Sequence, residues 1–254
     1  MKIAKKILNI IAMLAITILG MFTIWGISIR HVLSPKEIIS SMDRANYATD
    51  VEEKLRSEFK YYLDEEKTQD IFVKAPIKEN IKYILSGVSD QSVEEKSENV
   101  KQEVKNIIYR NLSELVSTEN AEIFSKNMSE KYIKAILPVS QINKYSKLYV
   151  KYIGKLNSFI ICSLIVTLII TVIVFLDKES VRFGIISLYN VIIMSVPLAI
   201  VILTNSNIAL GSIRKVVQQI LYGVVATVGI QIGVIILALV VINYLLYFRN
   251  KNKW

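Results

Sequence analysis

The sequence contains a single cysteine, Cys162, and a single histidine, His31. Because Cys162 lies in an apolar run, the polar part of the chain can form neither a disulfide nor a CxxC metal site. The lone histidine excludes an HExxH motif, and it excludes a Ser-His-Asp triad everywhere except around His31. No phosphate-binding loop of the GxxxxGKS/T type occurs. We therefore predict that the chain is not an enzyme and has no catalytic residue, no metal site and no cofactor.

Asp, Glu, Lys, Arg and His are all absent from four long apolar runs, 7–29, 156–176, 183–203 and 220–248. At about 1.5 Å of rise per residue, a helix of each length crosses the roughly 30 Å hydrocarbon core of a bilayer. We predict four transmembrane helices. Proton relays and many ion-coupled sites need an ionisable residue at membrane depth, so this absence argues against a stand-alone proton-coupled transporter. The mixed segment 204–219 indicates a helix lying in the membrane interface before the last span.

The first run follows lysines, a pattern that also describes a secretory signal peptide. It is longer than the apolar region of a typical signal, however, and no clear small-x-small cleavage site follows it. We interpret it as an uncleaved anchor. The predicted domains are 1–29, the N-terminal tip and first span; 30–155, a helical domain; and 156–254, the remaining three spans.

Apolar residues recur at helical spacing throughout 30–155. The predicted fold is therefore all-α, with a bundle of about four to six helices inserted between the first and second spans. Capping patterns predict helix starts at Ser34–Glu37, Asp50–Glu53 and Ser92–Glu95, and Ile71–Val73 is the one possible short strand. The apolar stripes predicted to form the core comprise Val51, Leu55, Phe59, Tyr62, Leu63, Ile77, Ile81, Ile84, Leu85, Val100, Val104, Ile107, Ile108, Leu112, Leu115, Ile123, Phe124, Met128, Tyr132 and Ile136.

The net charge of +9 lies almost entirely beside the apolar runs. Residues 30–155 hold 21 basic and 20 acidic side chains, and the rest of the chain holds 10 and 2. A nucleic-acid binder would concentrate the excess on its folded domain, so we predict no nucleic-acid partner. Short segments on one side of the membrane contain Lys2, Lys5, Lys6, Lys178, Arg182, Arg249, Lys251 and Lys253, and the opposite short loop contains Arg214 and Lys215. The positive-inside rule then places both termini in the cytoplasm and 30–155 outside the plasma membrane.

The segment from Pro138 to Leu176 joins the helical domain to the second span, and its pattern predicts one nearly continuous helix. At 100° per residue, four lysines fall on one arc of its polar half; they are Lys144, Lys147, Lys151 and Lys155. This strip predicts contact with lipid headgroups or with an acidic partner. The alternative is a solvated face beside a tyrosine stripe that faces the core.

Small and polar residues within the apolar runs are candidates for helix packing. Ser163, Thr167 and Thr171 recur at intervals of four, and Gly229 with Gly233 forms a GxxxG motif. Asn190 and Gln231 are amides that either bond between helices or line a substrate path. The sequence leaves open whether these residues pack the spans of one chain or associate two chains.

The order of one span, a large outer domain and three further spans resembles the FtsX/MacB-type subunits of ABC transporters. Arg182-Phe183-Gly184-Ile185 resembles the glycine-containing segment after their second span. The predicted cytoplasmic turn of about six residues is shorter than the coupling helix that those subunits present to an ATPase. We therefore expect a non-enzymatic binding, assembly or signalling component whose outer domain contacts another membrane or envelope protein. The alternative is a permease-like or mechanotransmitting subunit that works with a separate cytoplasmic partner.

Overall fold

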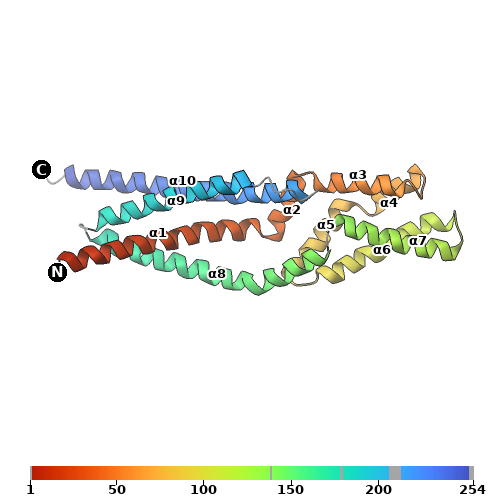
Figure 1. Cartoon of the computed structure of the whole chain (residues 1–254), viewed down its shortest axis with the longest axis horizontal. Helices are drawn as coiled ribbons and strands as arrows, with labels where there is room; N and C mark the ends of the chain where they lie inside the picture. The colour runs from red at the N-terminus through yellow and green to blue at the C-terminus, as the bar shows by residue number, and fades with distance from the viewer. Residues whose placement is uncertain (1, 138, 178–179, 206–212, 252–254) are drawn as a thin grey trace. The chain divides into compact units, whose positions relative to one another are not determined.

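A computed structural model gives the fold and describes residues 2–137, 139–177, 180–205 and 213–251 (Figure 1). The regular structure in these ranges is entirely helical, which confirms the all-α prediction. The elements are α1 (Lys2–Val32), α2 (Pro35–Arg44), α3 (Tyr47–Phe59), α4 (Glu65–Lys74), α5 (Ile77–Leu85), the 3-10 turn η1 (Ser86–Ser89), α6 (Val93–Ser113), α7 (Thr118–Ile136), α8 (Val139–Leu176), α9 (Val181–Asn205) and α10 (Arg214–Lys251).

These elements form two compact units. Unit 1 comprises Met1–Leu33, Lys155–Ile208 and Ile220–Trp254, and unit 2 comprises Ser34–Gly154 and Ala209–Gln219. Two helices, α8 and α10, contribute residues to both units, and the division within α8 falls after Gly154.

Two predicted features lie partly outside the described residues. The predicted helix start at Pro138 is one of them, and α8 is described from Val139. The predicted interfacial helix is the other, because 206–212 are not among the described residues. Residues 214–219 of that segment form the first turns of α10 rather than a separate helix.

The four long apolar helices are α1, α8, α9 and α10. Their spans of membrane-crossing length and composition are Ile3–Val32, Ser140–Leu176, Val181–Thr204 and Arg214–Phe248. These helices fit a multi-pass membrane protein, as the four uncharged runs predict. In unit 1 the start of α1 and the end of α10 lie at the same end of the helices (Figure 1).

Side-chain caps mark the starts of α2 and α4 in unit 2, whereas α3, α5, α6 and α7 begin without one; α6 starts after Ser92 as predicted, but the Ser92 side chain does not cap it. Ser34 caps α2, and its Oγ accepts a hydrogen bond from the backbone N–H of Glu37 at 3.4 Å. The predicted start at Asp50 is wrong, because α3 begins three residues earlier. It follows Asn46, which adopts a left-handed φ of 54° and makes no side-chain cap. Asn tolerates this conformation better than most residues, so the chain can turn there and leave Asp50 inside the helix.

The possible strand at Ile71–Val73 is also wrong, because these residues lie in α4. Asp64 caps this helix by accepting a hydrogen bond from the Lys67 N–H at 2.8 Å. Ile71 and Phe72 are buried while Val73 is 67% exposed, which is a helical and not an alternating pattern. The cap and the buried face outweigh the strand preference of a short β-branched run.

Aromatic side chains organise the core of unit 2. The ring of Phe72 lies 5.7 Å from Phe59 and 6.4 Å from Tyr132, measured between centroids. Tyr132 is fully buried, its hydroxyl donates to the carbonyl of Ala75 at 2.6 Å, and it accepts from Nδ2 of Asn80 at 2.9 Å. Burial raises the pKa of Tyr132, so the hydroxyl remains a donor throughout the ordinary pH range. These bonds tie α7 to the chain between α4 and α5.

In unit 1, α1 packs directly against α8, α9 and α10. A Cβ placed on Gly20 would lie 3.1 Å from Cγ2 of Val191 in α9, and one on Gly26 would lie 3.0 Å from Cγ1 of Ile160 in α8. A Cβ on Gly223 of α10 would lie 3.4 Å from Val32. These glycines permit close approach of the helices.

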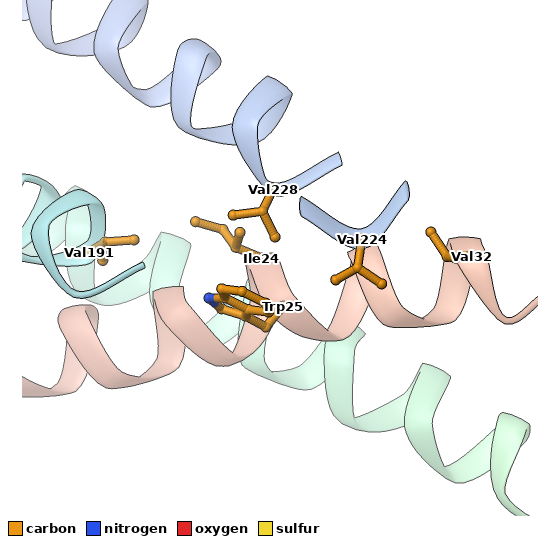
Figure 2. Packing of buried hydrophobic residues seen from close by; sticks show 6 residues of the cluster. All are labelled: Ile24, Trp25, Val32, Val191, Val224 and Val228. Carbon is orange, nitrogen blue, oxygen red and sulfur yellow. The ribbon is translucent and has the colours of Figure 1, made fainter. Parts of the chain in front are cut away.

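A small apolar cluster marks the crossing of α1 with α9 and α10. Figure 2 shows Ile24 and Trp25 of α1 beside Val191 of α9 and Val224 and Val228 of α10. The indole N–H of Trp25 also donates to Oγ of Ser195 in α9 at 3.4 Å. α1 is therefore the central packing helix of unit 1.

Candidate functional site

The four lysines of the predicted strip, Lys144, Lys147, Lys151 and Lys155, are all exposed on α8. On a neighbouring part of the helix, the rings of Tyr145 and Tyr149 lie 5.9 Å apart and are half-buried. Ser146 is buried, and its hydroxyl donates to the carbonyl of Val88 in η1 at 2.9 Å. The first part of α8 is thus held on unit 2 while the lysines remain accessible, and their contact with lipid or a partner stays a prediction.

The predicted packing residues on α8 do not share one role. The hydroxyl of Ser163 lies 2.9 Å from that of Thr23 in α1, and it donates to the carbonyl of Leu19 at 3.0 Å. Thr167 instead bonds within its own helix, to the carbonyl of Ser163 at 2.7 Å. Thr171 lines a cavity between the long helices. The structure therefore places only Ser163 in a hydrogen bond between α8 and α1.

The two glycines of the GxxxG motif face away from the other helices of unit 1. Gly229 and Gly233 are exposed, and a Cβ at either position would meet no atom within 4 Å. Gln231 lies between them in sequence but on another face, and its Nε2 donates to Oγ of Ser28 in α1 at 3.2 Å. Asn190 is half-buried in α9. The close helix approaches occur instead at Gly20, Gly26 and Gly223, which sequence reasoning missed because none of them belongs to a GxxxG motif.

Sequence reasoning also missed a surface on unit 2 where apolar side chains gather in the open. We call it the tip surface and define it as Tyr61, Tyr62, Leu115, Val116 and Phe124. Tyr61 is 86% exposed and Leu115 is 53% exposed. Its residues come from the turn between α3 and α4, the turn between α6 and α7, and α7 itself. The two turns lie at the same end of unit 2 (Figure 1).

Three members of the predicted core stripes are exposed because of where α3 and α6 end and which face of α7 is buried. α3 ends at Phe59, so Tyr62 is past the helix and leaves its apolar face. α6 ends at Ser113, so Leu115 likewise lies past the end of its helix and leaves the apolar face. In α7 the buried face runs through Ala121 and Ser125, and Phe124 lies off it. The predicted core residues Met128, Tyr132 and Ile136 are buried, so the prediction for α7 is wrong only in its first turns, where small residues form the buried face. Ile123, also predicted as core, is likewise exposed.

Contacts beneath the tip surface hold its parts together. The rings of Tyr62 and Phe124 lie 5.8 Å apart, and Nζ of Lys131 lies 5.8 Å from the centroid of Tyr62. Lys67 at the start of α4 pairs with Glu114 in the turn after α6 at 3.3 Å. Both turns are therefore anchored to neighbouring elements, and the apolar side chains stay exposed on a supported surface.

A polar link between α4 and α6 adds to this support. Nδ2 of Asn111 donates to Oδ2 of Asp70 at 3.1 Å, and Lys74 pairs with the same carboxylate at 2.9 Å. The hydrogen bond from Lys74 and the one from Asn111 lower the pKa of Asp70. The carboxylate therefore stays ionised to a lower pH than an ordinary aspartate does, and it helps to position α4 against α6.

The charged hollow between α6 and α7 has its charges neutralised within the chain. It has a volume of about 570 Å³ and is lined by Glu98, Lys101, Glu130 and Lys134, among others. Lys101 pairs with Glu98 at 3.3 Å, and Lys134 lies 4.0 Å from Glu130. Across the ranges that the structure describes, no group of three or more His, Cys, Asp or Glu side chains is arranged to hold a metal ion. The tip surface is the better candidate for recognition.

Comparisons with protein-family models, with curated proteins and with solved structures found no match.

Proposed function

We propose that this protein is a non-enzymatic membrane component whose unit 2 binds another membrane or envelope protein through the tip surface. The observation that carries the proposal is the gathering of Tyr61, Tyr62, Leu115, Val116 and Phe124 on one supported, exposed surface. Contiguous exposed apolar side chains on a folded domain mark sites of protein interaction. Tyrosine also favours such a role, because it provides a large contact area at a low cost in conformational entropy.

We place unit 2 outside the plasma membrane and both termini in the cytoplasm. The basic side chains near the start of α1, around the connection between α8 and α9 and at the end of the chain outnumber those near the start of α10. Lys5 pairs with Asp177 at 3.2 Å, which supports one shared side for the start of α1 and the connection between α8 and α9. Lys178 and Lys253 of this tally lie outside the described residues.

We further propose that α8 transmits binding at unit 2 to the membrane helices. It is a single helix from Val139 to Leu176, and Gly154 is the one glycine within it. Ser146 attaches its first part to Val88 in unit 2, and Ser163 attaches its second part to Thr23 in unit 1. A helix held at both ends transmits a rotation or displacement better than a flexible linker does. The exposed lysines on α8 lie along this same path and would contact headgroups of membrane lipids.

Photo-crosslinking in intact cells tests the binding proposal. A photoreactive phenylalanine analogue at Tyr61 should yield a discrete crosslinked protein, and the yield should fall when Leu115→Ser is added. The matched control is Tyr83, which is 43% exposed on α5, toward the other end of unit 2 (Figure 1). Equal products from both positions, or no product from either, would contradict the proposal.

Insertion of a Gly-Ser segment after Gly154 tests the coupling separately. We expect membrane insertion and the Tyr61 crosslink to persist while the cellular function of the protein is impaired. An insertion of the same segment after Gln91, in the exposed turn between η1 and α6 and outside the tip surface, serves as the control for added length. Normal function with the flexible insertion would contradict the coupling and leave the binding proposal standing.

The alternative function, a permease-like or mechanotransmitting subunit of FtsX/MacB-type topology, stays a hypothesis. α8 ends at Leu176 and α9 begins at Val181, which leaves four residues between them. That length favours the first proposal, because a coupling helix for an ATPase needs more chain than this connection supplies.

A further inference from the structure

A cavity of about 740 Å³ lies among the four long helices of unit 1. Three of the helices line it over similar lengths: α1 from Ile16 to Ile27, α8 from Leu164 to Phe175 and α10 from Gln231 to Ile242. α9 adds Leu188 and Val191. Its volume falls within the range of about 300–1,000 Å³ that is typical of ligand pockets in proteins.

One hydrogen-bonding contact between α8 and α1 lies at the border of the cavity. The hydroxyls of Ser163 and Thr23 lie 2.9 Å apart, and Thr23 itself lines the cavity. The lining stretch of α8, Leu164–Phe175, begins directly after Ser163. Leu164, Leu168 and Val172 of this stretch are 42%, 55% and 56% exposed, so the cavity is open along its side.

The lining is apolar, and three of its four polar side chains bond within the chain. No ionisable side chain lines the cavity. The hydroxyl of Thr23 lies 2.9 Å from that of Ser163, Thr167 donates to the carbonyl of Ser163 at 2.7 Å, and Gln231 donates to Ser28 at 3.2 Å. A polar ligand would lose its hydration there with little return, and water is poorly held in an apolar cavity. The occupant must be a hydrocarbon.

The length of the cavity identifies the kind of hydrocarbon. Each lining stretch covers about 16 Å at a rise of 1.5 Å per residue, which is close to half of the roughly 30 Å hydrocarbon core. Half of that core is the depth filled by the acyl chains of one leaflet. We propose that this cavity holds an acyl chain of a bilayer phospholipid between α8 and α10. The site is independent of the tip surface and of the proposed binding by unit 2.

Photo-labelling by lipid tests this assignment on the full chain. The protein is reconstituted into phosphatidylcholine vesicles that contain a phosphatidylcholine with a diazirine in mid-chain, and labelled residues are mapped by mass spectrometry. We expect Ile235 and Ile242, which line the cavity and are partly buried, to be labelled severalfold more strongly than Ile230 and Val240, which are more exposed but lie outside it. Equal labelling of the two pairs would overturn the proposal.

Filling the cavity gives the second arm of the experiment. Ala238→Phe should reduce labelling of Ile235 severalfold and should reduce the phospholipid that is retained in detergent. Ala226→Phe is the matched control, because Ala226 is exposed on the same helix and does not line the cavity; it should change neither readout. Thr171→Phe fills the cavity from α8 and replaces the first variant if that one loses helix content. Unchanged labelling in a folded, filled variant would also overturn the proposal.

Discussion

Eleven of the twelve largest fully buried side chains in the described ranges lie in unit 2, and the twelfth, Ile16, lies in unit 1. Fully buried serines occur in both units: Ser41, Ser125 and Ser129 in unit 2, and Ser28, Ser187 and Ser195 in unit 1. Large apolar side chains in unit 1 are mostly exposed along the four long helices. In water, burial of large apolar surface is the main driving force for folding. In a bilayer that driving force between helices is absent, and helices associate through close packing of small residues and hydrogen bonds. The two units thus differ in how much large apolar surface they bury.

The largest effect is expected from truncating the core of unit 2. Phe59→Ala removes a ring with no exposure that packs on Phe72. Loss of a buried phenylalanine costs about 3–5 kcal/mol of folding free energy. The midpoint of thermal unfolding, followed by circular dichroism on the full chain in detergent, should fall sharply, while Tyr61→Ala at the tip surface should leave it nearly unchanged. A small effect of Phe59→Ala would mean that unit 2 is not held by this core.

The next largest effect is expected from enlarging a glycine of unit 1. Gly20→Val adds a Cβ only 3.1 Å from Val191, so α1 and α9 must separate or strain. Overpacking of this kind costs about 1–3 kcal/mol. Gly229→Val is the matched control, since a Cβ there meets no atom within 4 Å. Thermal stability in detergent should fall for the first variant only. If the control falls instead, Gly229 packs against a second copy of the chain.

A smaller effect is expected from the hydrogen bond between α1 and α8. Ser163→Ala and Thr23→Ala each remove one of the two hydroxyls, which lie 2.9 Å apart. Bonds of this type between membrane helices contribute about 0.6 kcal/mol on average. A double-mutant cycle on unfolding in detergent should give a coupling energy of this size. Strict additivity of the two variants would show that the hydroxyls act separately.

The smallest effect is expected from Asp70, and it disappears in acid. Because its pKa is lowered in the folded state, its contribution is present above the ordinary value of 3.8 and is lost as the pH falls through the lower folded value. Asp70→Asn should therefore destabilise unit 2 slightly near pH 6, and the difference from the unmodified protein should vanish below that lower value. Urea unfolding at several pH values measures it. A difference that persists in strong acid would contradict the assigned cause.

The membrane helices and most of unit 2 were predictable because their patterns are local. Four uncharged runs predict α1, α8, α9 and α10, and the serine and proline at Ser34 and Pro35 predict the start of α2. The errors occurred where a contact between residues far apart in the sequence decides which side chain is buried or where a helix begins. Nothing local distinguishes Tyr62 from a core residue, and nothing local indicates that α3 begins at Tyr47. Tyr47 is fixed by its hydroxyl, which donates to the carbonyl of Ile136 at 3.1 Å across the unit.

The candidate sites also differ in whether the local sequence predicts them. The lysine strip on α8 follows from residue spacing within one helix, and its exposure agrees with that spacing. The tip surface depends on two turns that are far apart in the sequence, and the acyl-chain cavity depends on four helices. Neither has a sequence motif, because each is made by elements that meet only after folding.

The sequence by itself determined the helical class and the four membrane-spanning helices, because charge-free length and helical period act over a few neighbouring residues. Only the tertiary structure decided which glycines permit close packing. It selected Gly20, Gly26 and Gly223, which meet neighbouring side chains, and it left the GxxxG motif of Gly229 and Gly233 facing outward. A GxxxG motif indicates that a helix can be approached closely by another. Whether it is approached depends on the presence of a neighbouring helix, which the whole fold decides.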